Sequence, residues 1–167
     1  MANHTPVIIG VGEIKNPSRR MEDAIEPLDL MIRAINAAAH DAAGGETTDL
    51  LAQIDAVSVV ASSTWPYDDL PGLVAERLSI QPSYTAYSEL TGNSSVQLVD
   101  STARLIAQGR AKFGVIVGGE AFASCTDMYL PLIMPFANIS PLFPVRCSEN
   151  IYQEQSVSTT LDTSERE

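Results

Sequence analysis

Segments with two different hydrophobic periods alternate along the first three-quarters of the chain, and this alternation limits the fold more than any other feature. Residues 6–12 (PVIIGVG) form an apolar run typical of a strand buried on both faces, and residues 54–61 (IDAVSVVA) and 113–117 (FGVIV) are also typical of strands. Residues 84–90 form a fourth, weaker strand segment. Because helix-period segments separate these runs, the sequence predicts right-handed crossovers and an α/β fold with a mostly parallel sheet.

Three segments between the strands have the spacing of amphipathic helices. The first begins near Glu26-Pro27 and continues to residue 43, where Gly44 and Gly45 supply a stop. A short helix is expected over residues 71–78. A third begins after residue 93 and ends at Gly109, and its wide apolar face predicts a helix that lies deep in the protein.

The regular pattern ends near residue 123, which divides the chain into three parts. Residues 1–123 are expected to form the α/β domain. Residues 124–147 are interrupted by prolines, which bar a helix or a central strand, and they are expected to be irregular. Residues 148–167 are polar, with few apolar anchors, and we expect a disordered tail.

Charge and cysteine content exclude several classes of protein. The 167 residues include 21 acidic and 10 basic side chains, a net charge of −11, which argues against nucleic-acid binding. Two cysteines, Cys125 and Cys147, cannot build a disulfide framework, which favours a reducing, intracellular compartment. No basic segment followed by an apolar one opens the chain, and no apolar run is long enough to span a bilayer. A soluble protein is expected.

Short motifs give few independent indications of chemistry. Gly10 and Gly12 suggest a dinucleotide-binding turn, but Lys15 replaces the third glycine, so glycines that let a buried strand leave the sheet explain them better. His4 and His40 have no neighbours at metal-ligand spacing, and no metal site is expected. Neither cysteine opens a predicted helix, so both are more readily explained as bystanders than as nucleophiles.

The segment after the third strand predicts a strand-to-helix elbow. It contains Gly92, Asn93 and Ser94, in which the glycine allows a tight turn and either polar residue can cap the first helical amides.

Taken together, the order of several segments resembles the amino-terminal half of the thiolase superfamily. The segments are TPVIIGVGE (residues 5–13), IDAVSVV (54–60), Trp65 with Tyr67, LVAERL (73–78), TGNS (91–94), AQG (107–109) and GGEA (118–121). The closer similarity is to the thiolase-like branch described as acetyl-CoA acetyltransferase or sterol-carrier-type. The resemblance covers about residues 5–123. It implies a βαβαβαββ half that normally packs against a similar carboxy-terminal half.

The resemblance also implies where chemistry would occur and what is missing. The nucleophilic cysteine of thiolases lies at the start of the buried helix, and the family pattern places that position at Gly92. The catalytic histidine and the acid/base cysteine come from the carboxy-terminal half, which the sequence does not match. Ser94 without a nearby base is a poor nucleophile. We therefore expect a truncated thiolase-like protein of lipid metabolism without complete catalysis, no catalytic residues, and no bound cofactor.

Acyl-CoA is the ligand that the resemblance implies, with Trp65, Gly92, Asn93 and Ser94 as substrate-binding residues. A half that normally packs against another would expose apolar surface, which favours a homo-oligomer. Residues 84–90 resemble the strand that thiolases pair across a dimer. The alternative is a non-catalytic interaction module that completes a longer thiolase-like partner.

Overall fold

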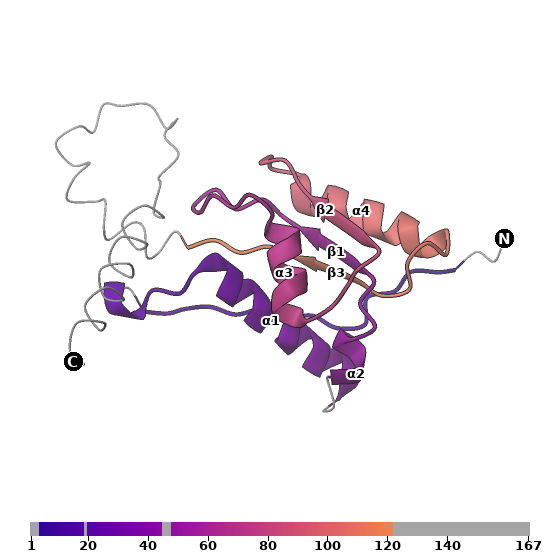
Figure 1. Cartoon of the computed structure of the whole chain (residues 1–167), viewed down its shortest axis with the longest axis horizontal. Helices are drawn as coiled ribbons and strands as arrows, with labels where there is room; N and C mark the ends of the chain where they lie inside the picture. The colour runs from indigo at the N-terminus through magenta and orange to yellow at the C-terminus, as the bar shows by residue number, and fades with distance from the viewer. Residues whose placement is uncertain (1–3, 19, 45–47, 122–167) are drawn as a thin grey trace, which may run out of the picture.

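A three-stranded parallel sheet forms the centre of the molecule (Figure 1). The structure is a computed structural model and describes residues 4–18, 20–44 and 48–121. The strands are β1 (Ala56–Val59), β2 (Tyr84–Tyr87) and β3 (Gly114–Val117), in the order β2-β1-β3. Ala56 is in register with Tyr84 on one side and with Gly114 on the other. The α/β class and the parallel sheet are therefore as the sequence predicts.

The three predicted helices lie at the predicted places. They are α1 (Pro27–Ala43), which precedes β1, α3 (Leu70–Leu78), which connects β1 to β2, and α4 (Ser94–Ala107), which connects β2 to β3. Pro27 begins α1, where its missing N–H costs nothing, and Gly44 ends it in the left-handed conformation with φ 65°. Two short elements are absent from the sequence-based prediction, the 3-10 helix η1 (Met21–Asp23) and α2 (Thr48–Leu51).

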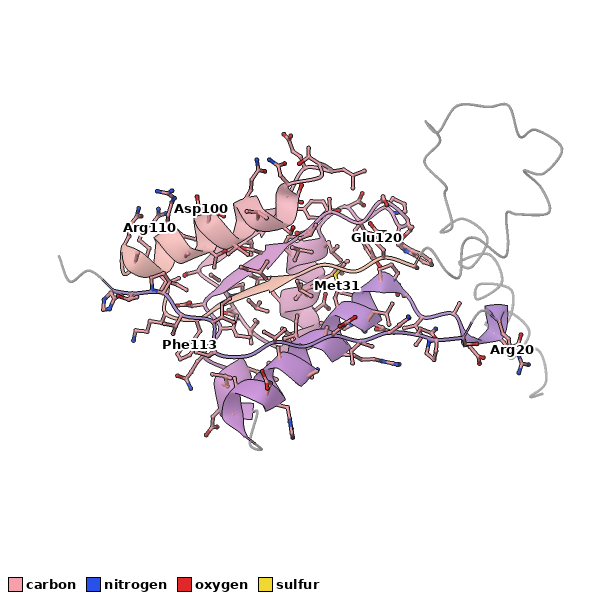
Figure 2. All side chains as sticks on the ribbon, turned by 180° about the vertical axis from the view of Figure 1, so that it is seen from behind. Arg20, Met31, Asp100, Arg110, Phe113 and Glu120 are labelled. Atoms are coloured by element: carbon pink, nitrogen blue, oxygen red, sulfur yellow. The ribbon has the colours of Figure 1, made fainter. Side chains whose placement is uncertain are left out.

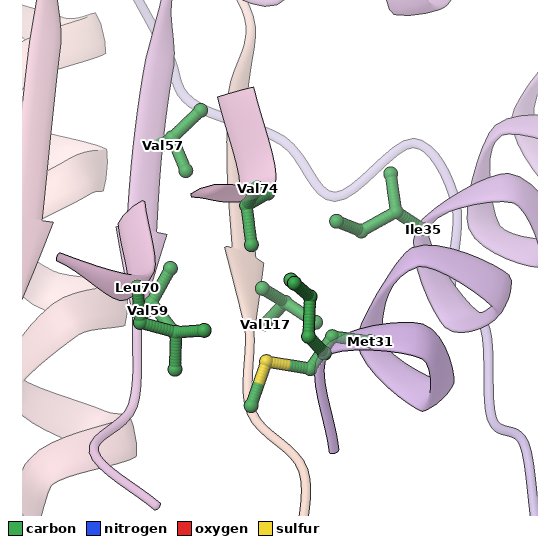
Figure 3. Close-up of a cluster of buried hydrophobic side chains, with 8 residues drawn as sticks. Met31, Ile35, Val57, Val59, Leu70, Val74 and Val117 are labelled. Carbon is green, nitrogen blue, oxygen red and sulfur yellow. The ribbon is translucent and has the colours of Figure 1, made fainter. Parts of the chain in front are cut away.

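Both faces of β1 are covered, because successive side chains of a strand point to opposite faces. Val57 and Val59 face α1 and α3, in the cluster of Figure 3. That cluster consists of Leu28, Met31, Ile35, Val57, Val59, Leu70, Val74 and Val117. On the other face, Ser58 Oγ lies 2.9 Å from Thr102 Oγ1 of α4, which satisfies two buried hydroxyls.

The predicted depth of α4 is only half correct. Leu98, Thr102 and Leu105 are buried, but Val96 is 69% exposed and Val99 is 47% exposed. The apolar face of this helix is wider than the sheet that covers it in the described part of the chain.

The predicted strand at residues 6–12 is wrong. The segment is extended, but it belongs to no strand, and Val7 and Ile8 are 71% and 82% exposed. Gly10 and Gly12 are not strand exits either. They allow the segment to lie against α1, because a Cβ on Gly12 would overlap the carbonyl oxygen of Ala34. Composition alone could not show that no strand of the described part of the chain pairs with this segment.

The predicted irregular segment, the polar tail and both cysteines lie outside the described residues. Among the residues that are described, no helix is long and apolar enough to cross a membrane.

Candidate functional site

Three loops meet at the carboxyl end of the parallel strands, the edge at which open α/β sheets bind ligands. Residues 60–69 follow β1, residues 88–93 follow β2, and residues 118–121 follow β3. Glu120, at this end in Figure 2, is far from Phe113 at the start of β3. Because the strands are adjacent and parallel, these loops are the natural place for a site.

Glu120 ties the loop after β3 to the loop after β1. One carboxylate oxygen accepts from the Ser63 N–H at 2.7 Å and from the Ser63 hydroxyl at 3.0 Å. The other accepts from the Thr64 hydroxyl at 2.7 Å, the Thr64 N–H at 3.2 Å and the Ser62 hydroxyl at 3.2 Å. The buried Thr64 hydroxyl in turn accepts from the Ala121 N–H at 3.1 Å. Five donors thus converge on one carboxylate.

This arrangement alters two pKa values. Partial burial raises the pKa of Glu120, but the hydrogen bonds from the Ser63 N–H and from the three hydroxyls outweigh it, so the pKa lies below its ordinary value of 4.5. Burial raises the pKa of Tyr87, and the negative charge of Glu120 raises it further. A hydrogen bond with the backbone of Ser62 lowers this pKa but does not outweigh the burial. Glu120 is therefore an anion at neutral pH and is held as a hydrogen-bond acceptor.

A second set of hydrogen bonds joins the loop after β1 to the loop after β2. The Ser88 N–H donates to the Val59 carbonyl at 3.0 Å, and the Ala61 N–H donates to the Ser88 hydroxyl at 2.9 Å. Trp65, in the first of these loops, is only 6% exposed. Its ring therefore packs mostly inside the protein, and little of it is exposed to solvent at this edge of the sheet.

The predicted elbow lies where expected, between β2 and α4, but its polar side chains do not cap the helix as predicted. Asn93 occupies the N-cap position and makes no side-chain cap hydrogen bond. Its amide oxygen accepts instead from the Thr91 hydroxyl at 2.8 Å. Ser94 is buried, and its hydroxyl bonds to Thr91 and to the Glu89 carbonyl. The hydroxyl is thus committed to the turn.

Gly92 is the open point of the elbow. The residue is exposed, and a Cβ built on it meets no atom within 4 Å. A side chain therefore fits at this position without displacing its neighbours.

The structure thus places Trp65, Gly92 and Asn93 on adjacent loops at one end of the sheet, with Ser94 as the first residue of α4. Sequence reasoning missed Glu120 and Ser88 as linking residues. The position of Glu120, directly after a strand and two glycines, was the available signal. In the described part of the chain, no three His, Cys, Asp or Glu residues are grouped to hold a metal ion.

A cavity of about 540 Å³ lies elsewhere, beside residues 6–12 and β3, and none of the four predicted substrate-binding residues lines it.

Comparison with solved structures identifies the architecture. An SCP2-thiolase-like protein type 1 from Mycobacterium smegmatis superposes with a TM-score of 0.56 and 26% identity over 68% of this chain. The fold is thiolase-like. A variant of OleA from Xanthomonas campestris gives a TM-score of 0.53 at 17% identity over 81% of the chain. Cerulenin-bound OleA from the same organism gives 0.50 at 14% identity.

The thiolase-like chain spans only part of these proteins, 23% of the mycobacterial protein and 38% of the OleA variant. No family model matches the sequence, and no curated protein matches it. The resemblance expected from the sequence is therefore confirmed at the level of fold.

Proposed function

We propose that this chain is a thiolase-like protein related to acyl-CoA acyltransferases of the acetyl-CoA acetyltransferase type, and that it performs no acyl transfer itself. The observation that supports the proposal is the elbow before α4, where Gly92 stands at the position that the family pattern gives to the nucleophile. A glycine cannot form a thioester, and the hydroxyl of Ser94 is held by the turn.

The same elbow supports binding of the thioester end of an acyl-CoA. The first amides of a helix carry a partial positive charge, and Asn93 leaves them without a side-chain cap. The open space around Gly92 would admit a thioester carbonyl beside these amides. Acyl-CoA binding without turnover is therefore the activity proposed for this chain.

The test is thiolysis of acetoacetyl-CoA by the purified full-length chain, together with calorimetric titration with acetyl-CoA. We expect acetyl-CoA binding and no thiolysis above the uncatalysed rate. Turnover by the unmodified chain would refute the absence of catalysis, and no measurable binding at millimolar ligand would refute the proposed ligand class.

Gly92→Cys sharpens this test, because the open space lets the variant fold as the parent does. A thiol there is expected to have a pKa below that of free cysteine, since it lies at the amino terminus of α4. This pKa is measured from the pH dependence of the rate of alkylation by iodoacetamide. Cys125 and Cys147 are replaced by serine in this experiment, so that only the introduced thiol reacts. Gly92→Ala is the matched control for binding. We expect the cysteine variant to remain inactive in thiolysis, for lack of a catalytic base; restored turnover would contradict this.

A further inference from the structure

The hydroxyl of Ser88 ends the hydrogen-bond ladder between β1 and β2. At the start of β2 the Tyr84 N–H donates to the Asp55 carbonyl, and just after its end the Ser88 N–H donates to the Val59 carbonyl at 3.0 Å. The next rung of a parallel ladder would run from the Ala61 N–H to the Ser88 carbonyl. The Ala61 N–H donates instead to the Ser88 hydroxyl, at 2.9 Å. A side chain thus takes the place of the backbone acceptor at this rung.

The same hydroxyl also reaches the turn that leads from β2 into α4 (Figure 1). It donates to the carbonyl of Glu89 at 3.0 Å. That carbonyl is shared, because it also accepts from the Thr91 N–H at 3.0 Å and from the hydroxyl of Ser94, the first residue of α4. Ser88 therefore joins the loop after β1 to the elbow through one hydroxyl.

The far end of this connection is held in place, whereas the elbow has little support of its own. Residues 62–64, which follow Ala61 directly, all donate to the carboxylate of Glu120. The loop after β1 is thereby fixed to the loop after β3. In the elbow, Gly92 has no side chain, and the Asn93 side chain makes no cap hydrogen bond to α4. The position of the elbow therefore depends on the bonds that reach it from neighbouring residues.

We propose that Ser88 is a positioning residue for the acyl-CoA site, an inference that rests on the function proposed above. Its hydroxyl ends the ladder and so keeps the elbow and the first amides of α4 in place around Gly92. In Ser88→Ala the Ala61 N–H loses its acceptor, and the carbonyl of residue 88 is the acceptor that the parallel pattern offers instead. Pairing with β1 would then continue by one rung and draw the elbow out of position.

The first measurement examines the elbow without acyl-CoA. Gly92→Cys is made with Cys125 and Cys147 replaced by serine, and the pKa of the introduced thiol is taken from the pH dependence of its alkylation by iodoacetamide. Addition of Ser88→Ala should raise this pKa by about 0.5 or more, toward the value of about 8.5 for free cysteine, because the thiol moves away from the first amides of α4.

Ser83→Ala is the matched control for the loss of a hydroxyl. The Ser83 hydroxyl also donates to a backbone carbonyl, that of Asp55 at 3.1 Å, but it lies before β2, at the opposite end of the strand. This control should leave the thiol pKa unchanged. Ser88→Thr retains a hydroxyl and should keep the value of the Gly92→Cys parent. An unchanged pKa in Ser88→Ala, or an equal rise in Ser83→Ala or Ser88→Thr, would overturn the proposal.

Calorimetric titration with acetyl-CoA tests the connection to the ligand. In the otherwise unmodified chain, Ser88→Ala should weaken acetyl-CoA binding about fivefold, which is the equivalent of one hydrogen bond, and Ser83→Ala should not weaken it. If the parent binds acetyl-CoA and Ser88→Ala binds it equally well, the positioning role is refuted while the proposed function stands. If the thiol pKa rises as expected but the parent binds no acetyl-CoA, Ser88 does position the elbow and only the proposed ligand class is refuted.

Discussion

Replacement of Glu120 by glutamine tests whether this carboxylate fixes the loops at the carboxyl end of the sheet. Glutamine has nearly the same shape, but it brings one carbonyl oxygen and an NH2 group in place of two charged acceptors. Donors from residues 62–64 would then face the NH2 group. The substitution therefore removes acceptors while it preserves packing.

The expected loss is worked from the hydrogen bonds. A hydrogen bond to a charged group contributes about 1.5–3 kcal/mol when it is buried. Glu120 is partly exposed, so solvent screening reduces this figure, and its five bonds share two oxygens. We expect Glu120→Gln to lower the free energy of unfolding by about 1–2 kcal/mol at neutral pH.

The pH dependence provides the sharper test. The folded-state pKa of Glu120 is depressed, so its stabilisation is fully present above the unfolded-state pKa and is lost as the pH falls through the lower folded-state value. The difference in urea unfolding between the parent and Glu120→Gln should therefore be full at about pH 7 and shrink as the pH falls below 4.5 and through the lower folded-state pKa. Glu76→Gln, at an exposed position on α3, is the control. A constant difference across this range would refute the reasoning.

Two further substitutions test the local geometry by urea or thermal unfolding. Gly12→Ala should cost about 2 kcal/mol or more, because its Cβ would overlap a backbone carbonyl of α1, whereas Gly92→Ala should be nearly neutral. Equal losses of unfolding free energy in these two variants would contradict the packing of residues 6–12 against α1. Asp69→Ala should lower the free energy of unfolding by about 1 kcal/mol, since the Asp69 carboxylate caps α3 by accepting from the Gly72 N–H. The neighbouring substitution Asp68→Ala is the control and should leave the free energy of unfolding nearly unchanged. Matched losses for the two aspartates would exclude the cap.

The sequence predicts best the features that depend on nearby residues. Proline at the start of α1 and glycine at its end act within one turn, and both boundaries are where the pattern places them. The segment at residues 6–12 shows the limit. Its apolar composition is that of a buried strand, but strand pairing needs a neighbour, and nothing in those residues shows whether one lies beside them.

The candidate site divides in the same way. Gly92 and Trp65 were predicted as substrate-binding residues from a resemblance in the order of motifs. The structure places both at the carboxyl end of the sheet, and their binding role stays a prediction. The linking role of Glu120 was missed because its partners lie 56–58 residues away in the sequence. A carboxylate that follows a strand directly is common, and only the tertiary fold shows that three hydroxyl side chains converge on it.

Two sets of exposed apolar residues need different explanations. Val7, Ile8 and Val11 lie on the extended segment beside β3 and line the cavity of about 540 Å³, together with Val99 of α4. Leu90 and Val96 do not line this cavity, yet they are 65% and 69% exposed near the start of α4. These two residues form a second exposed apolar surface, beside the elbow. An interface with another subunit would have to cover that surface, and because the elbow adjoins it, such contact would also narrow access to Gly92.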